Sequence, residues 1–495
     1  MNELFDNENG AFSGMGNVKT PDDNTYKNAV ANAIPALNGQ QKSKYDFYVD
    51  LLGGRKLVYD PTSVTSLSVY NPDSDNSENL IASPPTAATN FLKGADMSIV
   101  SNLEAGSISW SVDGADTDPY QILQDYGANV ARFRLWVNPT DFNNNAYNYS
   151  TESDVTAAIL RARAKGLKIL LDFHYSDTWT DESQNLLPAS WPDNVNHTIS
   201  DLSTRIRNYT YTTLSNMSTS GALPDYVQVG NEINSNILLS LPYEQYRDGS
   251  TNNVLSSLKP EIAAISGMSQ ASVTMDDVYK INWDRNAALI NAALNIVKTN
   301  FPSVATVLHI AGPGNAEWWA NQAFTTTDSE RRGTTTVNRS NVDIIGMSYY
   351  LGEEDQMQSF CELKSIIERI KSTHGKEVLI AETAFPSTWD YSDNQANIFS
   401  VGSRGNWPET TSPTVQRDWL ISLRLNLQNT DGATGFIVWE PFWVGSNTVD
   451  TKDFTGSNWE NLTFFDYATG TPVSSNPLNT TGGILAFCEG SCPAA

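Results

Sequence analysis

The feature that most constrains the fold is a regular alternation of short apolar runs with helical patterns, which begins near residue 93. The runs are rich in β-branched and aromatic residues, and each is followed by enough chain for a helix. Eight such runs occur, at residues 93–100, 128–137, 167–175, 225–232, 306–312, 342–350, 376–383 and 435–443. Among the helical patterns, residues 152–165 keep their apolar side chains on one face and end at Gly166, a residue favoured after a helix end.

Eight β/α units predict an α/β fold of the (β/α)8 TIM-barrel type, here spanning residues 91–490. An open doubly wound sheet is the structural alternative. It is disfavoured because it usually has fewer strands and a glycine-rich phosphate turn, and no G-x-G-x-x-G follows the first run. Residues 1–90 form an N-terminal extension and linker of unknown function, with strand-like runs at 45–52, 56–60 and 66–70. Residues 240–282 are a long insertion that would form a rim or a lid.

The charge balance excludes several classes of partner. The chain carries 56 acidic and 31 basic residues, a net charge of −25 at pH 7. Such a charge repels phosphate backbones and anionic membrane surfaces, so we expect no nucleic-acid partner and a neutral substrate. No apolar window is long enough for a membrane span. No signal peptide is visible, but Asn-x-Ser/Thr sequons are compatible with the extracellular location that we expect.

The candidate chemistry lies at the ends of the apolar runs, because the carboxyl ends of barrel strands form the active site. Glu232 ends the fourth run and Glu382 ends the seventh, on opposite sides of the predicted barrel mouth. Two carboxylates surrounded by aromatic residues suit glycoside hydrolysis, in which one acid protonates the leaving oxygen and the other carboxylate attacks or activates water. The three cysteines and four histidines have no zinc-ligand spacing, so we expect no metal and no cofactor.

Seven segments resemble glycoside hydrolase family 53, the arabinogalactan endo-β-1,4-galactanases. In chain order they are KGADMS (93–98), RFRLWVNP (132–139), DFHYSDTW (172–179), VQVGNEIN (227–234), IAETAFP (380–386), WEPFW (439–443) and WENLTFFD (459–466). The resemblance runs from about residue 93 to about 487 and covers every predicted strand. It implies a retaining clan A enzyme that cleaves β-1,4-galactan, the type I arabinogalactan side chains of pectin. Some bacterial relatives bind calcium after strand seven, but residues 389–394 match that site weakly.

The resemblance also implies roles for individual residues. Glu232 would be the acid/base and Glu382 the nucleophile. Arg134 would keep Glu382 ionised, with Arg132 as the alternative because the two arginines share a strand face. The remaining substrate-binding residues would be Asn231 at the sugar 2-hydroxyl, Tyr350 at the nucleophile, His174, Asp177, Trp179 and Trp439 along the cleft, and Asp96 on its floor.

Other assignments stay open at this stage. Glu440 is the main rival carboxylate and ranks as structural, while Asp172, His309 and Asp343 rank low because they lie at the beginning or middle of strands. Asp177 could simply cap a turn. The alternative functions are another clan A β-glycanase, such as a mannanase or endoglucanase, and a non-catalytic carbohydrate-binding barrel. A monomer is the default expectation for an enzyme that acts on a polymer.

Overall fold

The computed structural model describes residues 91–182, 184–191, 198–234, 237–238, 262–263, 266–325, 333–350, 360–400, 410–466 and 474–489, together with strands β1–β4. These four strands are β1 (Leu51–Leu52), β2 (Arg55–Tyr59), β3 (Leu67–Tyr70) and β4 (Leu80–Ile81). They form an antiparallel sheet in chain order, and the first three overlap the strand-like runs predicted in the extension. The rest of residues 1–90 lies outside the described part of the chain.

The predicted barrel is confirmed, because eight parallel strands close on themselves in the order β10-β11-β12-β13-β14-β5-β8-β9. The strands are β5 (Leu92–Asp96), β8 (Val130–Leu135), β9 (Lys168–Phe173), β10 (Tyr226–Val229), β11 (Ala305–Ala311), β12 (Ile344–Ser348), β13 (Glu377–Thr383) and β14 (Ala433–Val438). Each lies within or overlaps one predicted run. A parallel barrel excludes the open doubly wound sheet.

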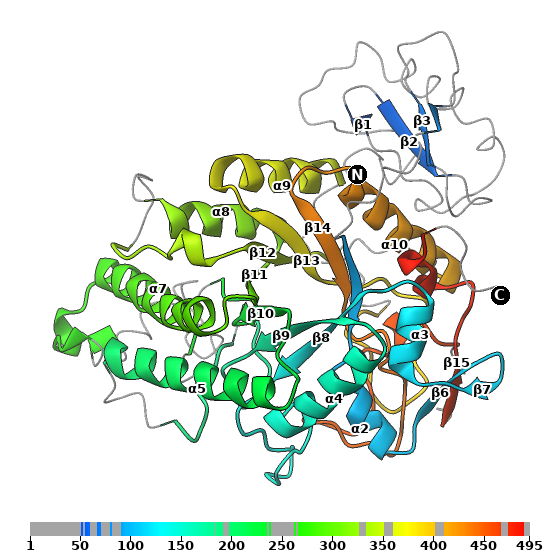
Figure 1. Cartoon of the computed structure of the whole chain (residues 1–495), viewed down its shortest axis with the longest axis horizontal. Helices are drawn as coiled ribbons and strands as arrows, with labels where there is room; N and C mark the ends of the chain where they lie inside the picture. The colour runs from blue at the N-terminus through cyan, green and yellow to red at the C-terminus, as the bar shows by residue number, and fades with distance from the viewer. Residues whose placement is uncertain are drawn as a thin grey trace.

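Helices follow the strands and surround the barrel (Figure 1). They are α2 (Val100–Ala105), α3 (Pro119–Asp125), α4 (Glu152–Ala164), α5 (Ile199–Thr219), α7 (Met275–Asn300), α8 (Pro313–Phe324), α9 (Phe360–His374) and α10 (Pro413–Gln428). Helix α7 starts inside the predicted 240–282 insertion, because Thr274 and Asp277 form a capping box. Only 262–263 and 266–282 of that insertion are described.

Short elements lie outside the barrel and were not predicted. Strands β6 (Ser109–Val112), β7 (Ala115–Asp116) and β15 (Ser475–Pro477) form a small sheet in the order β15-β6-β7, which joins the end of the chain to the first β/α unit. The 3-10 helices are Gln270–Ser272, Arg339–Asn341, Glu460–Leu462 and Gly483–Phe487.

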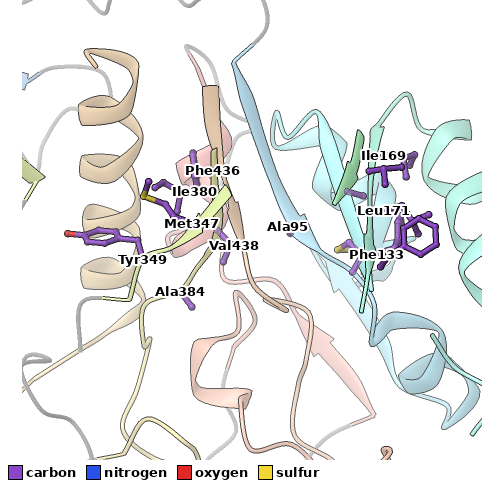
Figure 2. Close-up of a cluster of buried hydrophobic side chains, with 14 of the residues drawn as sticks. Ala95, Phe133, Ile169, Leu171, Met347, Tyr349, Ile380, Ala384, Phe436 and Val438 are labelled. Atoms are coloured by element: carbon purple, nitrogen blue, oxygen red, sulfur yellow. The ribbon is translucent and has the colours of Figure 1, made fainter. Parts of the chain in front are cut away.

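Successive side chains of each barrel strand alternate between the barrel interior and the helices. The inward set starts with an apolar floor near the strand beginnings, formed by Leu92, Val130, Leu170, Val307, Ile344, Leu379 and Ile437. The outward set packs beneath the helices, and Figure 2 labels some of its members, among them Phe133, Leu171 and Ile380. Both faces of each strand are therefore buried, which explains why the strands read as nearly continuous apolar runs.

Candidate active site

A layer of polar side chains lies above the apolar floor of the barrel. Arg132, Asp172 and His309 each follow a floor residue of their own strand by two positions, so the alternation turns them inward. Gln228 of β10 joins them, and all four residues are at most 1% exposed. Buried polar groups need hydrogen-bond partners, and these residues supply them to one another and to the strand ends above.

Arg132 is the centre of this layer. Its Nη2 atom lies 2.7 Å from Oδ2 of Asp172 and 2.8 Å from Oε1 of Glu382. The same atom donates to Oδ1 of Asn231 at 2.8 Å, and Nη1 lies 2.9 Å from Oδ2 of Asp96. Burial opposes the charge of the guanidinium, but the surrounding carboxylates raise the pKa of Arg132 above its ordinary value. Arg132 therefore stays cationic and holds these carboxylates around one charge.

Glu382 reaches the barrel interior through a β-bulge. Met347 of β12 pairs with Ile380 of β13, but the next residue, Ser348, pairs with Glu382. The extra residue, Ala381, changes the alternation, so Glu382 points inward although Leu379 is already a floor residue. Tyr350 donates a hydrogen bond to Oε2 of Glu382 at 3.2 Å, which is the contact predicted between these two residues. Burial raises the pKa of Glu382 to about 7, and Arg132 opposes that rise.

Glu232 stands on a strained turn just after β10. Gly230 has φ of +80° and Glu232 has φ of +46°, a conformation uncommon for a residue with a side chain. The turn is held where Ile233 N donates to the carbonyl of His309 at 2.9 Å. Oε1 of Glu232 contacts the hydroxyl of Ser348 on β12. The strain is thus offset by neighbouring strands, which direct Glu232 into the same cleft as Glu382.

The first-choice partner predicted for Glu382 was wrong. Nη1 of Arg134 donates to Oε1 of Glu440 at 3.1 Å, and Arg132, the alternative, pairs with Glu382. The reason is position along β8, since Arg134 lies one layer higher and its guanidinium lies 3.9 Å from the ring centroid of Trp179. Glu440 is fully buried and lies outside the cleft lining, and burial together with nearby Asp96 raises its pKa to about 8.

His174 lies at the cleft wall as a neutral histidine. Its Nε2 faces Oδ2 of Asp172 at 3.1 Å, and its Nδ1 accepts from Trp136 Nε1 at 3.3 Å and from Thr180 N at 3.2 Å. Because two N–H groups point at Nδ1, the ring proton is on Nε2 and is donated to Asp172. Burial lowers the pKa of His174, although Asp172 opposes that shift.

Two residues predicted to face the substrate lie elsewhere. Asp96 is fully buried below the cleft and accepts from Ser98 and Arg132. Asp177 accepts from the backbone N–H groups of Asn138 and Ala189, both at 2.7 Å, so it joins two loop segments. Neither lines the cleft, and their carboxylates are used to hold the backbone and Arg132 in place.

The cleft at the carboxyl ends of the strands encloses about 500 Å3. Trp179 and Trp439 line it as predicted, with ring centroids 6.0 Å apart, and Nε1 of Trp179 donates to Asp453 at 2.7 Å. Aromatic faces beside carboxylates can stack on the apolar faces of sugar rings. The full lining is Arg132, Arg134, His174, Trp179, Thr180, Asp181, Glu182, Gln184, Asn231, Glu232, Ala311, Tyr350, Glu382, Ile398, Trp439, Trp443, Thr451, Asp453, Phe454, Asn458 and Trp459.

Sequence reasoning ranked Asp172 and His309 low and did not consider Ser348, yet all three belong to the network of the two glutamates. Asp172 shares Arg132 with Glu382, and Nε2 of His309 lies 2.9 Å from Oγ of Ser348. The signal was available, because two-residue spacing puts each of them on the inward face of its strand. Position along the strand was the wrong criterion for ranking these residues, because the face of the strand decides whether a side chain reaches the network.

The loops after β13 and β14 are joined directly by two buried carboxylates. Asp393 accepts from the backbone N–H groups of Ser446 and Ser457, at 3.1 and 2.6 Å. Glu460 accepts from Ser392 N at 2.5 Å and from Ser392 Oγ at 2.6 Å. Within the described residues no group of three or more His, Cys, Asp or Glu side chains could hold a metal ion. These two carboxylates are instead occupied by hydrogen bonds between the loops.

A (β/α)8 barrel whose mouth brings two glutamates and several aromatic rings into one cleft defines a glycoside hydrolase type of site. Residues 92–476 match glycosyl hydrolase family 53, and the chain belongs to this family. The predicted family is therefore confirmed over every strand of the barrel.

Similar proteins come from several organisms. The chain is 36% identical over 385 residues to an arabinogalactan endo-β-1,4-galactanase of Cellvibrio japonicus, covering 76% of this chain and 87% of that protein. It is 26% identical to an enzyme of the same name from Thermothelomyces thermophilus, over 74% of this chain and 95% of that protein. The Ignisphaera aggregans GH53 catalytic domain superposes with a TM-score of 0.62 at 26% identity, covering 82% of this chain and 97% of that one.

None of the described helices is both long enough and apolar enough to cross a bilayer.

Proposed function

We propose that the protein is an endo-acting, retaining β-1,4-galactanase, in which Glu232 is the acid/base and Glu382 is the nucleophile. The observation that carries the proposal is the placement of the two glutamates in one cleft, with Arg132 2.8 Å from Glu382. Two carboxyl groups at the barrel mouth suit double displacement at a sugar C1. The names of the relatives support galactan, the side chain of pectin, as the substrate.

The positions of the side chains support the following first half of the reaction. Glu232 gives its proton to the glycosidic oxygen as the bond from that oxygen to C1 breaks, and the carboxylate of Glu382 forms a bond with C1. Arg132 and the hydroxyl of Tyr350 favour the ionised form of Glu382 before attack. In the second half, Glu232 takes a proton from water as the water oxygen displaces Glu382 from C1.

Side chains that line the cleft contribute the binding energy for the sugar at the cleavage point. Asn231 contacts His309 and lines the cleft together with both glutamates, so its amide can contact a sugar 2-hydroxyl. Such contacts strengthen as positive charge develops at C1. Trp179 and Trp439 provide apolar surfaces on which galactose rings can stack.

We further propose that the protein acts outside the cell and as a monomer, without a nucleic-acid partner. A polysaccharide of pectin is too large to enter a cell intact, so the enzyme must meet it outside. The charge of −25 supports a partner without phosphate groups.

The test is release of reducing ends from linear β-1,4-galactan, galactomannan, β-glucan and arabinogalactan. We expect activity on galactan and a loss of several orders of magnitude in both Glu232→Gln and Glu382→Gln. Glu317→Gln, which removes a surface ion pair with Arg369, is the matched control. Retention is tested by NMR, because the first product must keep the β-anomeric configuration. If only mannan or glucan is cleaved, the enzyme has a substrate other than galactan. If galactan is bound but not cleaved, the barrel is a sugar-binding protein.

A further inference from the structure

A chain of hydrogen bonds runs below the cleft from Asn231 through His309 and Ser348 to Glu232. Nδ1 of His309 lies 2.8 Å from Oδ1 of Asn231, and Nε2 lies 2.9 Å from Oγ of Ser348. The same Oγ contacts Oε1 of Glu232. His309 and Ser348 are fully buried, so both ring nitrogens and the hydroxyl depend on protein partners.

The orientation of the Asn231 amide is fixed by its other partners. Its Nδ2 donates to the carbonyl of Thr180 at 2.7 Å, and its Oδ1 accepts from Nη2 of Arg132 at 2.8 Å. A carbonyl can only accept and a guanidinium can only donate, so the amide cannot be reversed. Oδ1 therefore faces Nδ1 of His309 at 2.8 Å, and because two acceptors cannot hydrogen-bond, Nδ1 carries a proton and donates it to Oδ1. Nε2 of Gln228 also lies 3.2 Å from Nδ1, but its two hydrogens have closer acceptors in a carboxylate at 2.7 Å and in Oδ1 of Asn231 at 3.1 Å.

Two hydrogen bonds of this network remain, and each needs one proton between its two atoms. They join Nε2 of His309 to Oγ of Ser348, and Oγ of Ser348 to Oε1 of Glu232. A hydroxyl has one proton to donate and can accept through its lone pairs. The second proton is therefore held either by Nε2, which would make His309 a cation, or by the carboxyl group of Glu232.

The surroundings of His309 decide between the two. Burial, and then the positive charge of Arg132, lower the pKa of His309 well below its usual value. Asp172 is the opposing group, but it is already paired with Arg132 at 2.7 Å. The ring is neutral, so the second proton belongs to Glu232.

We infer that His309 and Ser348 are positioning residues that keep Glu232 in its protonated, proton-donating form. Glu232 donates to Oγ of Ser348, Ser348 donates to Nε2 of His309, and Nδ1–H of His309 donates to Asn231. This inference rests on the proposed role of Glu232 as general acid. When Glu232 has given its proton to the leaving oxygen, Ser348 can donate to either His309 or Glu232 but not to both, so the ionised state has one hydrogen bond fewer.

Other charged or titratable groups line the cleft with Glu232. Negative groups favour the protonated form and positive groups oppose it. They are Arg132 and Arg134 of β8, His174, Asp181 and Glu182 after β9, Tyr350 after β12, Glu382 of β13 and Asp453 after β14.

The first test reads the ring of His309 directly and does not depend on catalysis. The chain has four histidines, so nitrogen-15 labelling gives few signals, and His309→Gln identifies the one that matters. We expect a neutral ring protonated at Nδ1 and not at Nε2, unchanged between about pH 5 and pH 8. A proton on Nε2, in a neutral or a cationic ring, would overturn the inference.

The second test is the pH dependence of kcat/KM on galactan for Ser348→Ala. The variant removes the acceptor of the Glu232 proton, so we expect the basic limb to move to lower pH by roughly one unit. The acidic limb of the profile should keep its position. A serine that only donates to a Glu232 carboxylate would give the opposite shift when removed, so the sign is diagnostic. His309→Leu should also lower the basic limb, because it frees the Ser348 hydroxyl to stabilise the carboxylate.

Controls separate this inference from the proposed function. Ser422→Ala removes a buried hydroxyl that donates to the carbonyl of Asp418 within α10, and it should leave both limbs in place. If Glu232→Gln cleaves galactan as fast as the unmodified protein, the role of Glu232 as acid fails. If Glu232 proves essential but the basic limb stays or rises in Ser348→Ala, the positioning role of Ser348 and His309 is wrong and the proposed function stands.

Discussion

Arg132 and Glu382 form a buried ion pair, with Nη2 of the arginine 2.8 Å from Oε1 of the glutamate. The arginine side chain is 1% exposed and the glutamate side chain 9%, so little water screens the pair. The same nitrogen also serves Asp172 at 2.7 Å. One cation thus ties the proposed nucleophile to the polar layer of the barrel, and its removal should affect both the pH profile and the stability.

The first prediction concerns Arg132→Gln. Glu382 must be ionised to attack, so activity falls as the pH drops through its pKa, which is about 7. Without the arginine we expect the acidic limb of kcat/KM to rise by roughly one to three pH units. Breaking the buried pair should also lower the free energy of unfolding by roughly 3–5 kcal/mol. Arg134→Gln is the comparison, and an equal shift of its acidic limb would contradict the assignment of Arg132.

The second prediction concerns the buried Glu440, whose pKa rises to about 8 through burial and the nearby Asp96. The folded protein keeps a proton that the unfolded chain releases above about pH 4.5, so this group makes stability fall as the pH rises from about 4.5 to about 8. Glu440→Gln cannot release that proton. We expect the free energy of unfolding of Glu440→Gln, relative to that of the unmodified protein, to rise by roughly 3 kcal/mol between pH 5 and pH 8.

Urea unfolding at the two pH values measures this difference. Any constant cost of changing the partner of Arg134 cancels, because the arginine is charged at both. Parallel stability curves for the two proteins would show that Glu440 is ionised throughout.

The third prediction concerns how Trp179 is held. Its indole N–H donates to Asp453 at 2.7 Å and its ring lies over Arg134, so the ring is fixed from two sides. We expect Trp179→Ala to weaken galacto-oligosaccharide binding roughly tenfold, with a smaller loss for Asp453→Asn. Calorimetry in a Glu382→Gln background measures both. Trp318→Ala, an exposed tryptophan outside the cleft lining, is the control. If Trp179→Ala and the control bind the oligosaccharide with equal affinity, Trp179 is not part of the sugar site.

The strands and the two glutamates could be predicted because alternation and strand ends are visible in the sequence. The partner of Glu382 could not, since Arg132 and Arg134 lie on the same strand face and only the height of each along β8 decides. Asp177 illustrates a second limit. A carboxylate beside the cleft motif looks like a ligand, but the backbone N–H groups it receives belong to Asn138 and Ala189, which only the folded loops bring together.

The bulge in β13 is the third limit, and it leads to the last prediction. Nothing in the run around Ala381 indicates an extra residue, yet that residue turns Glu382 inward. Deleting Ala381 should remove the bulge and leave a regular strand in which Glu382 takes the inward position two residues after Leu379. We therefore expect the deletion variant to fold and to cleave galactan far better than Glu382→Gln. Ala381→Gly keeps the residue count and the bulge, and should also retain activity. Circular dichroism verifies that the barrel persists, and a loss of cleavage as complete as that of Glu382→Gln in the folded deletion variant would show that the bulge itself positions the nucleophile.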